Sequence, residues 1–449
     1  MSEALREAAR AIFAAALQAV DIKSAVQREI NVQPGILTIA GRSLPIAEVD
    51  RVLIVAIGKA AVPMFAAAQK SLIGLPVAAV VVAPIETHPA TPLQPEFSYK
   101  SNEVQYFSGS HPTPDVHSAK AARSILNLLN TATDRTVVLF LISGGASAMI
   151  EQPLDPRISL QDIANFHRAL VASGLNITQM NTLRKHISAV KGGRLATAAA
   201  RARMQCSLLI SDVPAAAPDA IASGPSLPDT TTVADCLPLF DRLKLSPNLP
   251  ISILEFFSNP QLPETPKPQD AAFARAHYKV ILSSDHLALA AQQAALAANF
   301  HATIDNTPDD WDYREAAEYL LNRSAALSLR SPRACLISVG EVSVTLPPTA
   351  GEGGRNQQMA LWCAEELARR GREAAILCAG SDGIDGHSTA AGAVCDDTTI
   401  ERAAAAGYSL TRALHDFHAS PLLHTIGDSI VTGPTGNNLR DLRLILTEA

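Results

Sequence analysis

The chain has 449 residues, of which 47% are hydrophobic and only 4% aromatic, and its formal net charge is −6. A chain of this length is too long for one hydrophobic core, so we expect two α/β domains. Because aromatic residues are scarce, their cores should consist mainly of Ala, Val, Leu and Ile. The acidic balance gives no electrostatic basis for a nucleic-acid partner or an anionic membrane surface.

The first twenty residues, "MSEALREAARAIFAAALQAV", form a helical pattern of mixed charge. Glu3 and Glu7 interrupt it, and it lacks the long apolar segment of a secretion signal. No apolar run in the chain approaches the length that crosses a bilayer. None of the six cysteines forms a CxxC pair, which favours reduced, buried thiols. We therefore expect a cytoplasmic protein without a membrane partner.

Short β-branched runs alternate with alanine-rich helical patterns, which is typical of parallel α/β sheets. Helices are expected to follow Lys59, Ala146, Gly193, Asp285 and Arg355. The expected strands span residues 51–58, 78–84, 136–143, 206–212, 278–284, 334–340, 342–347 and 374–380.

Proline is concentrated between Pro225 and Pro268, where nine of the 29 prolines fall. Little periodicity remains there except in "ADCLPLFDRL" and "ISILEFF". We therefore predict a connecting region. The predicted boundary near residue 240 separates an N-terminal domain, 1–240, from a C-terminal domain, 241–449.

The loops after the first and third expected strands are candidate anion sites, because open α/β sheets bind ligands beyond the carboxyl ends of their strands. Gly58 and Lys59 would place an ammonium and free N–H groups at a helix start, although such a lysine is often only solvated. The segment "SGGASA" could form an anion-binding nest or only a tight turn. Its candidate residues are Ser143, Gly144, Gly145 and Ser147.

Two further segments carry cations. The helical stretch "MNTLRKHISAVKGGRLA" contains Arg184 and Lys191, which could form one wall of an anion pocket or a solvated face. The segment "GEGGRNQQ" enters a helix with an arginine at the junction, an arrangement that suits a phosphate or carboxylate; the alternative is a flexible connector. Its candidates are Gly353, Gly354, Arg355 and Asn356.

Four acids stand where they could bind Mg²⁺, a hard cation that prefers oxygen ligands. They are Asp212, Glu341, Asp382 and Asp385. Helix caps and Asp-Gly turns are the alternative explanation, although the presence of several candidate anion loops favours the metal. The sequence does not show which of the four acids would bind it.

Neither GxxxxGK[ST] nor a GxGxxG after a strand occurs, since Asn356 stands where "GEGGRN" would need its third glycine. The local signals therefore argue against a Walker-type NTPase and a standard dinucleotide binder. Anion loops together with spare acids favour phosphoryl transfer, in which cations stabilise the migrating group and carboxylates carry magnesium.

The chain resembles the glycerate 2-kinase family with a C-terminal MOFRL domain. The resemblance rests on collinear motifs that include "IGKAA", "HPTPD", "LISGGASAM", "NTLRKHISAVKGGRLA", "LLISDVPAAAPDAIASGPSLPD", "GGRNQQMAL", "AGSDGIDG", "AAGAVCD" and "GDSIVTGPTGNNLRDLRL". They span most of residues 50–445 and place the MOFRL region at about 333–445.

This resemblance implies transfer of the γ-phosphoryl group of ATP to the 2-hydroxyl of D-glycerate, with Mg²⁺, to give 2-phosphoglycerate. It implies a Rossmann-like N-terminal domain, a C-terminal α/β domain and an active site in the interdomain cleft. It also implies catalytic roles for Lys59 and Arg355, and it allows a homodimer.

Three departures from the family pattern bear on this expectation. Ala146 replaces the third glycine of "SGGGS", Ala215–Ala217 replace a glycine and two acids, and Gln358 replaces a common glutamate. A methyl at Ala146 would narrow the nest if that position required positive φ. Two alternatives are therefore kept: a catalytically weakened ligand-binding homologue, and an NAD(P)H-dependent hydroxypyruvate reductase, a name given to some related chains.

Overall fold

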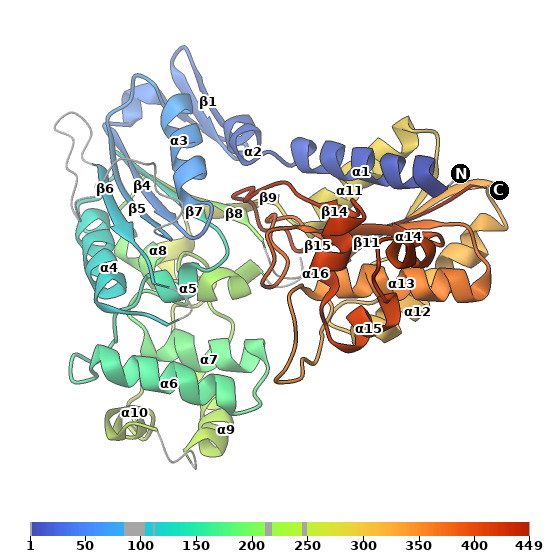
Figure 1. Ribbon diagram of the computed structural model, residues 1–449. Helices are drawn as coiled ribbons and strands as arrows, with labels where there is room; N and C mark the ends of the chain where they lie inside the picture. Colours follow the sequence, from blue (N-terminus) through green and yellow to red (C-terminus); the bar gives the residue numbers. More distant parts are fainter. Residues whose placement is uncertain (1, 85–103, 111–112, 212–217, 245–248, 449) are drawn as a thin grey trace. The chain divides into compact units, whose positions relative to one another are not determined.

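The computed structural model describes residues 2–84, 104–110, 113–211, 218–244 and 249–448. The chain forms two compact units, which Figure 1 colours along the sequence. The central unit is Ile22–Ile281, and the terminal unit joins Met1–Asp21 to Leu282–Ala449. The expected fold class, two α/β domains, is confirmed.

The central unit contains a six-stranded sheet in the order β6-β5-β4-β7-β8-β9, whose pairs from β6 to β8 are parallel. Numbered along this sheet, the order is 3-2-1-4-5-6, that of the Rossmann fold, and it reverses between β4 and β7. Its strands are β4 (Arg51–Ile57), β5 (Val77–Ala83), β6 (Val104–Ser108), β7 (Thr136–Ile142), β8 (Met204–Ile210) and β9 (Ala276–Leu282).

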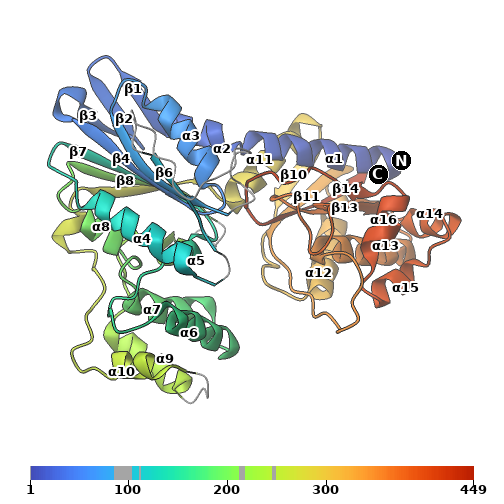
Figure 2. The ribbon, with the colours of Figure 1, turned by 60° about the vertical axis from the view of Figure 1, so that its left-hand side comes forward.

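Both faces of this sheet are covered, which explains why β7 and β8 are buried along their whole length. Helix α3 packs beside β4 and β5, whereas α4, α5 and α8 share a core with the other face (Figure 2). An antiparallel sheet β1-β2-β3 adjoins α2 and α3. These elements are α2 (Ile22–Glu29), β1 (Ile30–Gln33), β2 (Ile36–Ile39), β3 (Arg42–Pro45), α3 (Ala61–Ser71), α4 (Val116–Leu129), α5 (Ala146–Met149) and α8 (Arg194–Ala198).

The proline-rich region is not merely a connector, because its two periodic segments form α9 (Val233–Leu243) and α10 (Ile251–Phe257). These helices share a core with α6 (Leu160–Ala172) and α7 (Ile177–Ile187). Phe240 of α9 stacks on Phe257 of α10, with ring centroids 4.7 Å apart. The boundary predicted at residue 240 therefore falls inside the central unit, whose core includes residues from both sides of it.

The terminal unit contains a six-stranded sheet in the order β10-β11-β15-β12-β13-β14. Helices α1 and α11 lie on one face, and α12 and α13 cover the other (Figures 1 and 2). Its strands are β10 (His301–Ile304), β11 (Arg333–Gly340), β12 (Ala375–Gly380), β13 (Gly392–Asp396), β14 (Ser429–Ile430) and β15 (Asp441–Glu448). Its helices are α1 (Ser2–Ala19), α11 (Ser284–Ala297), α12 (Tyr313–Ser328), α13 (Arg355–Arg370), α14 (Thr399–Ala405), α15 (Leu410–His415) and α16 (Ala419–Thr425).

Two expectations fail in the terminal unit. Its sheet is mixed, because the last strand, β15, inserts antiparallel between β11 and β12. Residues 342–347 form no strand: Ser343 makes only an isolated bridge to Asp312. The segment ends in Pro347, and Pro348 follows it; neither residue offers an N–H donor to a ladder.

The expectation for the cysteines holds. All six cysteines are buried free thiols. No helix in the part of the chain that the structure describes is both long and apolar enough to cross a membrane.

Candidate functional site

The loops after β4 and β7 interlock at the point where the strand order of the central sheet reverses. The amide of Lys59 donates to the carbonyl of Gly144 at 3.0 Å, and the amide of Ala60 donates to Ser143 Oγ at 3.0 Å. Gly58 has φ +117°, and a Cβ there would overlap Ser143. Glycine is thus required where the loops cross. The structure therefore brings together two loops that were predicted separately, one with Gly58 and Lys59 and the other with Ser143 and Gly144.

The substitution at Ala146 does not disturb this turn. Gly145 holds the left-handed conformation, with φ 81°, and α5 begins at the next residue. The Ala146 side chain is fully buried in the core between the sheet and its helices. Its methyl group therefore fills core space, and positive φ is required one position earlier.

A series of side-chain hydrogen bonds extends from this turn into the segment "ASGPS", residues 222–226. Ser147 and Ser223 hydroxyls lie 2.9 Å apart, and Ser223 Oγ donates to Asn181 Oδ1 at 3.0 Å. Ala222 and Ser223 both have positive φ, 55° and 60°, a strained conformation for residues other than glycine. Such strain often accompanies functional sites. The sequence did not single out Asn181 or Ser223, although the serine and glycine of "ASGPS" are a polar-turn signal.

These residues line a pocket of about 540 Å³ in the central unit. Arg184 supplies charge to its wall; its Nε is buried and has no hydrogen-bond partner among the described residues. Burial lowers the pKa of Arg184, and the charge of Glu151 opposes this effect. Burial, followed by the charges of Lys191 and Arg184, lowers the pKa of His167, which also lines this pocket, well below its usual value.

Lys191 does not line this pocket, although it was predicted to form a wall of one together with Arg184. It is fully buried, and its ammonium pairs with Glu151 and donates to the carbonyl of Ile150 at 3.3 Å. Ser188 donates to the same carboxylate at 2.6 Å. Burial lowers the pKa of Lys191, and Glu151 opposes this shift. Its charge is thus engaged in a buried ion pair, whereas Arg184 and Arg168 are the arginines that line the pocket.

In the terminal unit, Arg355 is the first residue of α13 and contacts two acids. Its Nε and Nη2 donate to the two carboxylate oxygens of Asp441 at 2.6 and 3.2 Å. Its Nη1 donates to Glu341 at 2.9 Å. Burial raises the pKa of Glu341, and the Arg355 charge opposes that rise. Glu341 and Arg355 side chains each remain about one-third exposed, so both are accessible to a ligand.

Asp385 caps the helix that Arg355 begins. Its carboxylate accepts the amides of Asn356 at 3.0 Å and Gln357 at 2.8 Å. Burial raises the pKa of Asp385 to about 7. A Cβ on Gly354 would overlap Asp385, and one on Gly386 would overlap Gly353. Asp385, Gly353, Gly354 and Asn356 thus fix the start of α13.

The remaining candidate acids differ in their surroundings. Asp382 is half-buried, and its carboxylate accepts the amide of Ile384 at 3.1 Å. Asp382 and Asp441 lie on the same side of Gly380. If Gly380 had a Cβ, this atom would be 3.0 Å from a carboxylate oxygen of Asp382 and 3.4 Å from one of Asp441. Asp212 lies outside the described residues. Among those described, no three His, Cys, Asp or Glu side chains gather as a metal cluster.

Asp441 and its neighbours were not identified as candidate site residues from the sequence. Arg440, which precedes β15, has φ 67° and pairs with Asp309 at 2.6 Å. Asp441, the first residue of β15, pairs with Arg355. Together these side chains form a charged cluster. Arg443 is almost fully buried, and its guanidinium has no hydrogen-bond partner among the described residues. The signal was present as alternating charges in "LRDLRL", but only the pairing of β15 with β11 and β12 brings it to Arg355.

The two units place the chain in the class of two-domain α/β proteins whose glycine loops meet at the reversal point of a doubly wound sheet. Residues 8–258 match the family described as domain of unknown function DUF4147, and residues 334–441 match the MOFRL family.

Similar proteins of known sequence and structure carry two names. The chain is 34% identical to the D-glycerate 2-kinase of Thermotoga maritima, over 89% of this chain and 91% of that protein. It is 33% identical to a putative hydroxypyruvate reductase of Agrobacterium vitis, over 98% and 94%. The crystal structure of Thermotoga maritima glycerate kinase superposes with a TM-score of 0.83 at 32% identity, over 99% of this chain and all of that one. The chain belongs to the glycerate 2-kinase family, which joins a DUF4147 domain to a MOFRL domain.

Proposed function

We propose that this protein is a Mg²⁺- and ATP-dependent kinase that phosphorylates D-glycerate at its 2-hydroxyl to give 2-phosphoglycerate. The observation that carries the proposal is the interlocking of the Gly58–Lys59 and Ser143–Gly145 loops at the reversal point of the central sheet. Ligands of doubly wound sheets bind at that point. The names of the Thermotoga and Pyrococcus relatives, D-glycerate 2-kinase and glycerate 2-kinase, supply the substrate.

The cations are assigned by their surroundings. Lys59 is half-buried, and its ammonium makes no ion pair with a described residue, so it is available to phosphoryl oxygens. We assign Arg355 to the same transfer, because Asp441 and Glu341 hold its guanidinium while one-third of the side chain stays exposed. Fixed cations stabilise the charge that develops on a migrating phosphoryl group without reorganising.

The 540 Å³ pocket fits a small hydroxy acid. Arg184 would pair with its carboxylate, and the Ser147–Ser223–Asn181 chain would bind its hydroxyl groups. The hydrogen bonds of Ser223 Oγ with Ser147 and Asn181 fix the direction of this hydroxyl. The pocket therefore orients the acceptor rather than supplying charge alone.

The acids of the terminal unit fit Mg²⁺ because it binds oxygen donors and in kinases needs only one or two protein carboxylates beside the phosphates. Asp382 and Glu341 would hold it; the ion would neutralise phosphate charge. Asp382→Asn is expected to raise the Mg²⁺ concentration required for half-maximal rate by about tenfold, without changing folded stability greatly. An unchanged Mg²⁺ titration would remove Asp382 from the metal site.

The decisive test is product analysis. Purified protein is incubated with Mg-ATP and D-glycerate, and 2- and 3-phosphoglycerate are separated by ³¹P NMR. Formation of 2-phosphoglycerate is expected. ADP release without phosphoglycerate would indicate another acceptor, and no ATP consumption would favour the weakened homologue.

The alternative activity is reduction of hydroxypyruvate, which the name of the Agrobacterium relative favours. Its discriminator is loss of NADH absorbance on addition of hydroxypyruvate. The absence of a GxGxxG fingerprint after β4 argues against it, because that glycine pattern lets the backbone approach a pyrophosphate.

A further inference from the structure

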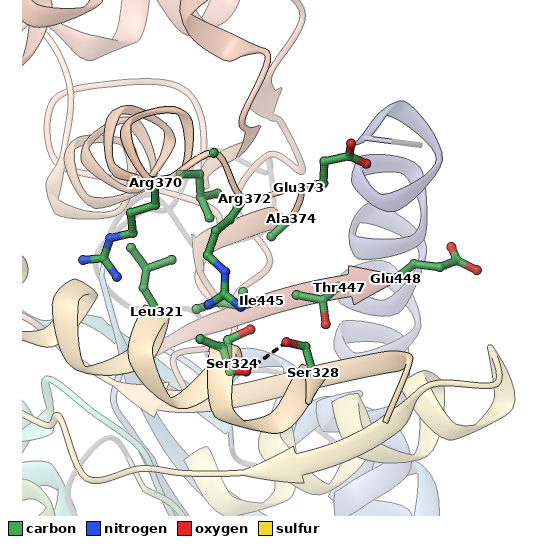
Figure 3. A pocket seen from close by; sticks show the side chains of 13 residues that line it. Leu321, Ser324, Ser328, Arg370, Arg372, Glu373, Ala374, Ile445, Thr447 and Glu448 are labelled. Atoms are coloured by element: carbon green, nitrogen blue, oxygen red, sulfur yellow. Dashed lines mark hydrogen bonds between the residues drawn. The ribbon is translucent and has the colours of Figure 1, made fainter. Parts of the chain in front are cut away.

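The terminal unit contains a second pocket, of about 420 Å³, formed by the end of α13, the residues leading into β12, α12 and the end of β15 (Figure 3). Arg355 begins α13, and Gly371 of this pocket ends it. A 16-residue helix is about 24 Å long, so the pocket lies far from Arg355. It is a separate feature from the site proposed for phosphoryl transfer.

Two arginines line the pocket, and only one has its charge compensated. Arg370 pairs with Glu318 at 2.5 Å and Glu366 at 3.1 Å. The half-buried Arg372 makes no side-chain ion pair or hydrogen bond within the described part of the chain. Figure 3 shows the Arg372 guanidinium directed into the pocket, toward α12. An uncompensated guanidinium in a concave site is suited to a carboxylate or phosphate.

A hydroxyl group provides a second, independent sign of a ligand. Thr447 Oγ1 is buried and has no hydrogen-bond partner among the described residues. Figure 3 places this hydroxyl on the side of Ser328, whose own hydroxyl donates to the Ala325 carbonyl at 2.9 Å. A buried donor without a partner is unfavourable, and a ligand oxygen beside Arg372 would satisfy it.

The other walls restrict the class of ligand. Leu321, Leu367 and Ile445 provide an apolar surface. Glu373 and Glu448 also line the pocket and disfavour a doubly charged phosphate. We propose that this pocket binds a small monocarboxylic acid, whose carboxylate pairs with Arg372 and Thr447 and whose apolar body packs on the leucine and isoleucine side chains.

The test uses the full chain and a fluorinated probe, 4-fluorophenylacetate, titrated by ¹⁹F NMR. Its neutral isostere, 4-fluorophenylacetamide, measures binding without the charge. Saturable binding of the acid is expected, at least about tenfold tighter than that of the amide, because hydrogen bonds to charged groups contribute this much. Equal affinity for acid and amide, or no saturation by the acid, would overturn the proposal.

Variants locate the binding. Arg372→Gln should weaken the binding of the probe acid by at least about tenfold. Arg330 is an exposed arginine outside the pocket, so Arg330→Gln should leave the affinity for the acid unchanged. Ala325→Leu should exclude the probe by filling the pocket while keeping Arg372. Wild-type affinity in both Arg372→Gln and Ala325→Leu would refute the site.

Competition distinguishes the ligand classes and the two sites. Inorganic phosphate should displace the probe more weakly than unlabelled phenylacetate; the reverse order would overturn the carboxylate assignment. Saturating D-glycerate and Mg-ATP should not displace the probe. Displacement by either would place the probe in the transfer site instead, and this result is independent of whether phosphoglycerate forms.

Discussion

Two lysines that the sequence treats alike have different surroundings. Lys191 is buried against Glu151, whereas Lys59 keeps an ammonium without an ion pair at the reversal point of the sheet. Residue type alone therefore does not distinguish a lysine in a buried ion pair from one whose ammonium makes no ion pair with the described residues. The same holds for Asp385, whose oxygens are used to cap α13.

Lys59→Ala is expected to lower kcat by about 100-fold or more, since removing one fixed charge from a phosphoryl-transfer site has effects of this size. The melting temperature should change little, because the ammonium makes no ion pair with described residues. Steady-state kinetics with circular dichroism measures both. Lys70→Ala, an exposed lysine of the same helix region, is the matched control. Full activity in Lys59→Ala would refute its catalytic role.

Asp385 should make stability depend on pH. Its folded pKa is about 7, raised from 3.8 by burial, so the folded state binds the proton more tightly than the unfolded state. This contribution is complete below about pH 4 and is lost as pH rises through 7, at up to about 1.4 kcal/mol per pH unit. Asp385→Asn should flatten the free energy of unfolding over this range. Urea denaturation in the presence of a chelator measures the free energy of unfolding at each pH. If Asp385→Asn leaves the pH dependence unchanged, the raised pKa of Asp385 is contradicted.

At the scale of elements, the candidate site consists of two paired loops rather than a single motif. The β4 and β7 loops interlock because their parallel strands are adjacent and because Gly58 leaves room for Ser143. The sequence predicted both loops and the helices after them. It could not predict their pairing, which depends on the strand order.

Gly58→Ala should destabilise the protein by about 1–3 kcal/mol and abolish most activity, because both the left-handed φ and the space are lost. Gly74→Ala is the matched control: its φ is +93°, but nothing lies within 4 Å of the added methyl. Gly74→Ala should lower the free energy of unfolding only through backbone strain, by about 1 kcal/mol, and the variant should keep its activity. Equal losses in the two variants, measured by urea denaturation and kinase assay, would show that packing against Ser143 is unimportant.

At the scale of the whole molecule, the chain contributes both of its ends to one unit. Helix α1 packs on α11 and on strands β12 and β15, and Leu5, Ile12 and Phe13 are buried there. The terminal sheet therefore depends on residues far from it in sequence. A division at a single point along the chain cannot describe this arrangement.

Phe13→Ala should reduce the stability of the terminal unit by about 3–5 kcal/mol, since it empties a buried aromatic site. Hydrogen exchange should accelerate in β12 and β15 but remain unchanged in β4 and β7 of the central unit. Phe273→Ala, in a half-buried position of the central unit, is the control for a general effect of losing a phenyl ring. Equal acceleration in both sheets would show that the units do not unfold separately.

The sequence by itself determined the α/β class, the buried thiols and the glycine loops, because hydrophobic periodicity and turn chemistry are local properties. The Rossmann-like first sheet was implied only by the resemblance to the family. Only the tertiary structure decided the mixed second sheet, the partners of Arg355 and the burial of Lys191. Each depends on contacts between distant segments: β15 inserts between β11 and β12, Asp441 reaches Arg355 across 86 positions, and Glu151 neutralises a lysine 40 positions away.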